Sequence, residues 1–330
     1  MGLSCGVRSF TRSSDDQTPP PAPRSAAHVA PRPAAPVAQR ETYRSQPRDD
    51  SRDLPREVAP RGVQPRVPAE ERIREIPVCG LTAVKALFET RPTAIKRLFF
   101  DLATSRRVGG ISGYLAGQRK IYRQVLPEEL EKIAGTIHHG GIVAIIEQAA
   151  LRAPAAEDLA GWVKAGKPVV LLDRIGNAHN LGAIGRTLAF FGIENLVVAA
   201  GESAARPGES SYRVAEGGME HVQVWVAADF ARLCGELRTA GFAVVGTAVR
   251  GPELRALRRE EFFPKPTGKD PVGTLKRPIA LVLGNEEAGL APDVMKACER
   301  LVRIPGSGKV ESLNVSAATA VLVAALMVGS

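Results

Sequence analysis

The sequence carries, near its C-terminal end, the stretch RIPGSGKVESLNVS (303–316), which is followed by the apolar run AATAVLVAALMV (317–328). Ser312 and Asn314 have side-chain oxygens that can accept hydrogen bonds from the free N–H groups at the start of a helix. Gly306 lacks a Cβ, so the backbone around it can approach a ligand closely. The stretch predicts a strand, a ligand-binding loop and a long apolar helix; the plainer interpretation is an ordinary capped core helix.

Two other interpretations of this stretch are excluded. A phosphate-binding loop would need Gly at position 303 and Ser or Thr at position 310, where the chain has Arg303 and Val310. The apolar run after Ser316 is too short and too rich in alanine to span a bilayer. Residues 1–10 also lack the apolar core of a secretory signal. We therefore expect a cytoplasmic protein without a membrane partner.

Composition and charge favour a globular protein that binds a polyanion. The chain has 330 residues, of which 44% are hydrophobic, and a formal net charge of +9. The length allows about two domains, and the positive charge favours nucleic acid as a partner. The four cysteines lie far apart without a CxxC pair, so we interpret them as reduced thiols rather than disulfides or a zinc site.

Residues 1–75 differ in composition from the rest of the chain. They hold 12 of the 25 prolines and no lysine, because the first lysine is Lys85. With few large apolar residues, this segment cannot bury enough surface to offset its ordering entropy. The composition predicts a disordered Pro/Arg-rich tail, either a solvated tail or a segment that holds RNA loosely.

Residues 76–147 have the pattern of a small α/β unit. Helices are expected at 79–88 and from Pro127 onward, and strands at 95–100, 121–125 and 141–146. His138 and His139 have no cysteine or acidic partner at ligand spacing, so we expect turn residues and no metal. Basic residues of this unit could face phosphates or simply lie on a solvated face: Arg106, Arg107, Arg119, Lys120 and Arg123. Residues 148–166 are expected to form a linker with one helical segment.

From residue 167 to 330, apolar strands alternate with helices. We expect strands at 168–173, 195–199, 222–226, 242–246, 279–284 and 301–304, with helices at 181–191, 230–240, 292–299 and 315–328. Near-continuous apolar strands separated by helices predict a parallel sheet covered on both faces. Ligands bind such sheets at the carboxyl ends of the strands, where the polar loops of this sequence fall.

Two further loops carry polar residues beside these strands. GNAHN (176–180) leads into a helix that Asn180 is placed to cap, and Arg186 follows about two turns later. GNEEAGL (284–290) follows a buried strand and contains Glu286 among glycines. Alone, Arg186 could be a surface arginine and Glu286 part of a simple acidic turn.

Together, the three segments resemble the signature of the SpoU (TrmH-type) RNA ribose 2′-O-methyltransferases of the SPOUT superfamily. The family pattern Asn-x-Gly-Ala-Ile-x-Arg-Thr matches 180–187, Leu-Gly-Asn-Glu-x-x-Gly-Leu matches 283–290, and Ile-Pro…Ser-Leu-Asn-Val-Ser matches 304–316. The unit at 76–147 is similar to the small substrate-binding domain of the family. Three ordered segments over about 160 residues form a specific pattern, whereas the tail matches no known family.

The resemblance implies a trefoil-knotted α/β domain at 167–330 and a homodimer with active sites at the subunit interface. It also implies S-adenosylmethionine as cofactor and RNA as substrate, with no metal. By matching position, the cofactor-binding residues would be Thr247, Gly284, Ile304 and Leu313, acting largely through the backbone. The catalytic and RNA-contacting residues would be Asn180, Arg186, Glu286, Ser312 and Asn314.

Two roles remain open for Arg186. The family assigns a general base to this position, but an arginine side chain keeps its proton at any pH near neutral. The alternative is a guanidinium clamp that holds the neighbouring phosphate and aligns the 2′-oxygen with the methyl group. Three segments depart from the commoner family pattern: Ala178–His179, Gly185 and Glu216–Gly218. These departures leave the target nucleotide open.

The sequence bears on three candidate functions. The first is 2′-O-methylation of a ribose in structured RNA, with ribosomal RNA favoured over transfer RNA because of the auxiliary domain. The alternative is a catalytically silent RNA-binding or ribosome-assembly factor of the same fold, against which Arg186, Glu286 and Asn314 argue. A nucleotide-binding oxidoreductase would need a glycine fingerprint after the strand at 169–173, where there is none.

Overall fold

The computed structural model describes residues 74–248 and 277–327. The tail expected at 1–75 therefore lies outside the described residues, except for Arg74 and Glu75. None of the helices in these two ranges is long and apolar enough to cross a membrane.

The larger sheet has six strands in the order β10-β8-β9-β5-β6-β7. In chain order they are β5 (Val169–Leu172), β6 (Asn195–Ala199), β7 (Gln223–Ala227), β8 (Ala243–Thr247), β9 (Ile279–Leu283) and β10 (Arg300–Val302). Every pairing between them is parallel. The parallel sheet predicted from the apolar strands is confirmed.

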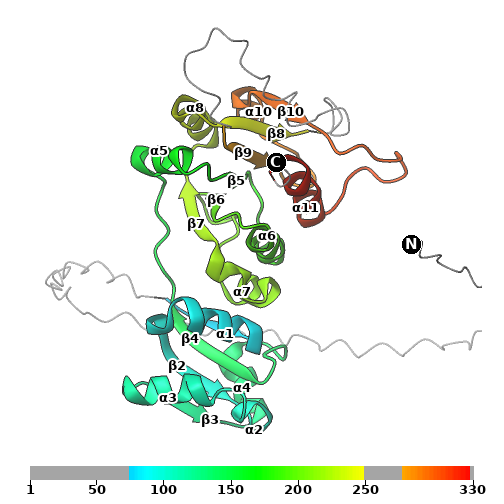
Figure 1. Ribbon diagram of the computed structural model, residues 1–330. Coiled ribbons are helices and arrows are strands. Elements are labelled where there is room, and N and C mark those ends of the chain that lie inside the picture. The colour runs from blue at the N-terminus through cyan, green and yellow to red at the C-terminus, as the bar shows by residue number, and fades with distance from the viewer. Residues whose placement is uncertain (1–73, 249–276, 328–330) are drawn as a thin grey trace, which may run out of the picture. The chain divides into compact units, whose positions relative to one another are not determined.

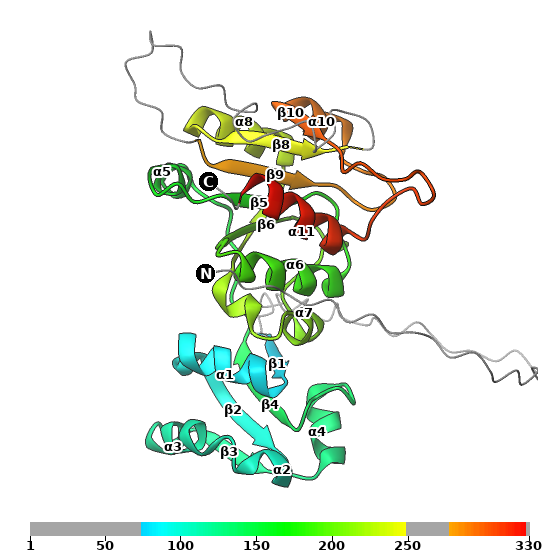
Figure 2. The same ribbon diagram turned by 45° about the vertical axis from the view of Figure 1, so that its right-hand side comes forward.

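Helices cover both faces of this sheet because alternate residues of each strand point to opposite sides. Val170 and Leu172 belong to one apolar cluster with residues of α6 (Ala178–Phe190) and α11 (Val315–Leu326). Val169 and Leu171 belong to another, with residues of three further helices: α5 (Ala156–Lys164), α8 (Phe230–Ala240) and α10 (Pro292–Ala297). In Figures 1 and 2, α11 lies beside α6, and α8 lies beside α10.

Two short elements that the sequence pattern did not predict pack on α6. They are α7 (Glu209–Ala215) and the 3₁₀ helix η2 (Gly218–His221). Two glycines of α6 make this close packing possible. A Cβ on Gly182 would lie 2.5 Å from the Ser211 carbonyl oxygen of α7, and one on Gly185 would lie 2.6 Å from Met219 Sδ of η2. Gly185, which departs from the family pattern, is therefore explained by close packing.

The smaller sheet has the order β1-β4-β2-β3. Its strands are β1 (Glu75–Cys79), β2 (Ile95–Phe100), β3 (Ile121–Gln124) and β4 (Ile142–Glu147), and only the β2–β3 pairing is parallel. Its helical elements are α1 (Leu81–Thr90), η1 (Pro92–Ala94), α2 (Leu102–Ser105), α3 (Gly109–Gly117) and α4 (Pro127–Ala134). The predicted elements of this unit are confirmed, with the first helix beginning at Leu81 rather than at Cys79. Strand β1 was missed because Pro77 interrupts its apolar run.

Candidate active site

A pocket lies at the carboxyl ends of three neighbouring strands, β8, β9 and β10. Thr247 at the end of β8, Leu283 at the end of β9 and Val302 at the end of β10 all line it. Its volume of about 420 Å³ lies in the range of small-molecule sites. The four expected cofactor-binding residues also line this pocket: Thr247, Gly284, Ile304 and Leu313. The structure therefore brings together residues that are up to 66 positions apart in the chain.

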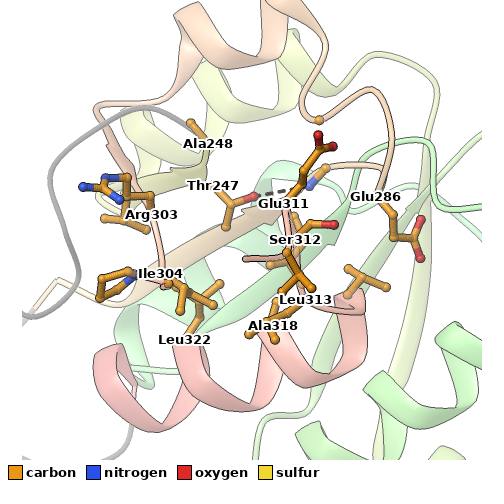
Figure 3. A pocket seen from close by; sticks show the side chains of 18 of the residues that line it. Thr247, Ala248, Glu286, Arg303, Ile304, Glu311, Ser312, Leu313, Ala318 and Leu322 are labelled. Carbon is orange, nitrogen blue, oxygen red and sulfur yellow. Dashed lines mark hydrogen bonds between the residues drawn. The ribbon is translucent and has the colours of Figure 1, made fainter. Parts of the chain in front are cut away.

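The pocket has an apolar side and a side with carboxylates. Figure 3 shows Ile304, Ala318 and Leu322 on the side of α11, opposite Thr247. Glu286 and Glu311 bring carboxylates to the lining. The Thr247 hydroxyl is used within the protein, because it donates to the Val282 carbonyl at 3.2 Å and accepts from the Gly284 N–H at 3.4 Å. A contact of Thr247 with a ligand would therefore run mainly through its backbone.

Gly284 is required by the shape of the loop that follows β9. A Cβ at this position would lie 2.4 Å from the carbonyl carbon of Gly289 and 2.5 Å from the Leu290 nitrogen. The 284–290 loop thus folds back directly onto Gly284. Asn285 and Gly289 close the loop through two backbone hydrogen bonds of 3.2 and 2.9 Å. This close approach within the chain explains the glycine before any ligand is considered.

Asp173 and Arg174, at the end of β5, support the same loop. Asp173 is buried, and its Oδ2 accepts the Ala291 N–H at 2.7 Å. Arg174 has a positive φ of 57° and donates to the Gly289 carbonyl at 2.9 Å. Asn285 Nδ2 donates in turn to the Arg174 carbonyl at 3.2 Å. Sequence reasoning missed these residues, although an aspartate that ends an apolar strand was a signal that could have found them.

Three predicted polar residues form a hydrogen-bonded chain beside the pocket. Asn314 Nδ2 donates to Asn180 Oδ1 at 3.2 Å, and Asn180 Nδ2 donates to Glu286 Oε1. Asn314 also caps α11, because its Oδ1 accepts the Ser316 N–H at 2.9 Å. Asn180 therefore links one residue from each of the other two signature segments into a single hydrogen-bonded chain.

The prediction that Asn180 caps its helix is wrong. Helix α6 begins at Ala178, and Asn177 is the cap, since its side chain accepts the His179 N–H at 2.8 Å. Asn180 lies inside the first turn, where its amide is free to bond to Glu286 and Asn314. Ser312, the other cap candidate, is exposed and lines the pocket.

Arg186 does not join this polar chain. It lies on α6 six residues after Asn180, and at 3.6 residues per turn the two side chains leave the helix about 120° apart. Arg186 Nη2 instead lies 3.1 Å from Glu216 Oε2, and both side chains are more than half exposed. The sequence had indicated Glu216 only as a departure from the family pattern and not as a partner of Arg186.

The remaining predictions concern the smaller unit. His139 Nδ1 accepts the Gly141 N–H at 3.2 Å, which is the contact of a turn residue. Of the five basic residues, Lys120 donates to the backbone carbonyls of Thr93 and Ile95, and Arg123 pairs with Glu129. The other three are exposed: Arg106, Arg107 and Arg119.

These features define an α/β protein with a small-molecule pocket at the carboxyl edge of a parallel sheet and a polar cluster beside it. The SpoU rRNA Methylase family model matches residues 167–324. A model described as RNA 2′-O ribose methyltransferase substrate binding matches residues 77–151. The chain belongs to the SpoU family of S-adenosylmethionine-dependent RNA methyltransferases, as its sequence signature predicted.

Individual relatives agree with this assignment. The chain is 33% identical over 260 residues to an uncharacterized tRNA/rRNA methyltransferase YfiF of Escherichia coli O157:H7, covering 79% of this chain and 70% of that protein. It is 31% identical over 242 residues to the 23S rRNA (guanosine-2′-O-)-methyltransferase RlmB of Nitrosomonas europaea, covering 72% and 86%. An AdoMet-bound rRNA methyltransferase from Sinorhizobium meliloti shares the fold, with a TM-score of 0.58, 24% identity and coverage of 76% and 86%.

The pocket fits S-adenosylmethionine on the chemistry of its lining. The apolar side formed by Ile304, Ala318 and Leu322 suits a flat heterocycle. The carboxylates of Glu286 and Glu311 suit a ligand that carries positive charge.

Proposed function

We propose that this chain methylates a ribose 2′-hydroxyl of structured RNA, ribosomal rather than transfer RNA. The observation that carries the proposal is the Asn314–Asn180–Glu286 chain, which joins all three signature segments beside the pocket. The names of relatives such as RlmB of Nitrosomonas europaea support ribosomal RNA and the 2′-oxygen.

We assign the roles of the site residues from this geometry. S-adenosylmethionine supplies an electrophilic methyl group on a sulfonium sulfur. Backbone groups around Gly284, Ile304 and Leu313 hold the cofactor, while Asn180 and Glu286 present hydrogen-bonding groups that orient the ribose. Ser312 in the pocket lining and Asn314 in the polar chain beside it contribute two further polar groups.

For Arg186 we favour the phosphate clamp over the general base. The Arg186 guanidinium lies 3.1 Å from the Glu216 carboxylate, so it already contacts an anionic oxygen, as a phosphate clamp would. An arginine that stays charged can hold a phosphate through two parallel hydrogen bonds but cannot accept a proton. The Glu286 carboxylate is the group of the polar chain that can take the proton of the 2′-hydroxyl.

We also propose that two copies of the chain complete each site. Arg186 lies away from the polar chain of its own copy, so a second copy would supply it. Helices α6 and α11 pack together and expose apolar residues, namely Phe190 on α6 and Ala317, Val321 and Ala324 on α11. An exposed apolar surface of this kind is typical of an interface. The trefoil knot stays a prediction, since residues 249–276 between β8 and β9 lie outside the described ranges.

The domain boundaries belong to the same proposal. The unit at 76–147 would bind RNA, and the unit at 167–330 would catalyse methyl transfer. The segment 148–166 would link the two units. The matches to residues 77–151 and 167–324 support this division.

The test is transfer of labelled methyl from S-adenosylmethionine to a 23S rRNA transcript, followed by digestion to nucleosides. A labelled 2′-O-methylnucleoside would support the proposal and identify the nucleotide. A methyl group on a base would contradict the mechanism. Binding of cofactor and RNA without transfer would favour the assembly-factor alternative.

A mixing experiment tests the shared site. Arg186→Ala and Glu286→Ala are each expected to be inactive, but a mixture that exchanges subunits forms mixed dimers with one intact site. We expect about a quarter of the wild-type rate from equal amounts, since half of the dimers are mixed. A mixture that stays inactive after subunit exchange would contradict the shared site.

A further inference from the structure

The five-residue segment 216–220, here called the 216–220 turn, follows α7, includes the first three residues of η2 and faces Arg186. Glu216 ends α7 with φ 46° and ψ 46°, the left-handed conformation. Its Oε2 lies 3.1 Å from Arg186 Nη2. The residue is therefore placed where it contacts the arginine that we assign to the RNA phosphate.

Glu216 does not stabilise the fold at this position. A left-handed conformation costs a residue with a Cβ about 1–2 kcal/mol, and an anion at the C-terminal end of a helix is unfavourable. The ion pair with Arg186 is more than half exposed on both sides, and such pairs contribute only about 0–1 kcal/mol. The exposed ion pair therefore does not offset the cost of placing Glu216 at this position.

The backbone of the turn is held close to Arg186. A Cβ on Gly218 would lie 2.8 Å from the Arg186 Cα and 3.2 Å from its nitrogen, so the turn rests directly on the α6 backbone. At the other end, the Glu220 side chain is 1% exposed and accepts hydrogen bonds from Arg91 at 2.5 and 3.0 Å. Glu216 is consequently fixed near the guanidinium.

A carboxylate and a phosphate compete for the same guanidinium, because both bind it through paired oxygens. When RNA binds, the phosphate must displace Glu216 and then lies close to its negative charge. Both effects weaken RNA binding at Arg186.

We infer that Glu216 is a positioning residue that acts as an exchangeable counter-ion of Arg186 and is replaced there by an RNA phosphate. This inference rests on the proposed function, because it takes Arg186 as the phosphate contact. Glu216 holds the guanidinium in place while no RNA is bound and lowers the affinity for RNA, which favours release of the product.

The test is filter binding of a 23S rRNA transcript to Glu216→Gln over a series of salt concentrations. The substitution keeps the size of the side chain and removes its charge. We expect about two- to five-fold tighter binding, the size expected of an exposed ion pair. We also expect the slope of log affinity against log salt to steepen by about 0.7–0.9, the contribution of one phosphate, because Glu216 no longer offsets the charge that Arg186 brings to it.

Glu236→Gln is the matched control. Glu236 pairs with Arg232 at 2.8 Å on α8, on the opposite face of the sheet from α6. This variant has the same change in net charge and also loses an exposed ion pair, yet its salt slope should equal that of the wild type.

Combining Glu216→Gln with Arg186→Ala tests whether Glu216 acts through Arg186. In the Arg186→Ala background, Glu216→Gln should leave the salt slope unchanged, because no guanidinium remains to be released. Equal affinities and slopes for Glu216→Gln and wild type would overturn the inference, and so would a lower kcat at unchanged KM. Binding is measured without methyl transfer, so an RNA-binding protein that transfers no methyl would contradict the proposed function while still testing Glu216.

Discussion

The 216–220 turn carries two glutamates, and each pairs with an arginine in a different way. Glu220 is almost fully buried and bonds to Arg91 through both carboxylate oxygens, while Arg91 also donates to the Tyr212 hydroxyl at 3.1 Å. Glu216, four residues earlier, makes one close contact with Arg186, and both side chains are exposed to solvent.

The difference separates an ion pair that holds the fold from one that can be exchanged. Removing one partner of a buried pair leaves an uncompensated charge and costs about 3–5 kcal/mol. An exposed pair is already in contact with water and can be replaced by another anion at little cost. Burial of the glutamate, rather than the type of residue, therefore decides which of the two ion pairs can exchange its anion.

The largest expected effect concerns Arg186, in the exposed pair, and it is an effect on methyl transfer rather than on stability. Arg186→Ala should lower methyl transfer by at least about 100-fold, because the reacting groups lose their alignment. Arg186→Lys should also fail, since lysine cannot reproduce the planar fork of the guanidinium. Equilibrium dialysis should show unchanged binding of S-adenosylmethionine; loss of cofactor binding would contradict the role assigned to Arg186.

Breaking the buried pair should act on stability instead. Arg91→Met leaves the Glu220 carboxylate buried without its partner and should lower the free energy of unfolding by about 3–5 kcal/mol, measured by urea denaturation. Lys167→Met breaks an exposed pair with Glu194 and is the control, with an expected loss below about 1 kcal/mol. Equal losses in the two variants would show that burial does not distinguish the pairs.

A methyl group added at Gly218, between Glu216 and Glu220, should lower the free energy of unfolding by an intermediate amount. Gly218→Ala places its Cβ against the Arg186 backbone, and such overpacking costs about 1–3 kcal/mol. Transfer should fall as well, since α6 must shift. Gly235→Ala on α8 meets no atom within 4 Å and should stabilise by about 0.5–1 kcal/mol. A neutral Gly218→Ala would show that the turn does not rest on α6.

The smallest effect is expected for Glu216→Gly. The substitution removes the ion pair but also relieves the left-handed conformation at φ 46°. Relief of the backbone outweighs the lost ion pair only slightly, because glycine loses more conformational freedom on folding, so the free energy of unfolding should change by less than about 1 kcal/mol. A loss of several kcal/mol would mean that Glu216 holds the fold, as Glu220 does.

The sequence by itself determined most of the strands and helices and the residues that line the pocket. Apolar strands such as Val169–Leu172 and Ile279–Leu283 predicted a parallel sheet with both faces covered, and the structure confirms it. The signature segments identified the family and the pocket residues. These features are encoded locally, because strand periodicity, turn glycines and motif spacing are properties of short segments.

Only the tertiary structure decided which residues meet. The sequence did not show that Asn180 lies inside its helix and contacts Glu286, 106 positions later. Nor did it show that Gly182 and Gly185 admit α7 and η2, or that Glu216 reaches Arg186. Such contacts depend on strand order and on how closely neighbouring elements approach. Both follow from packing the whole core, and no single segment contains that information.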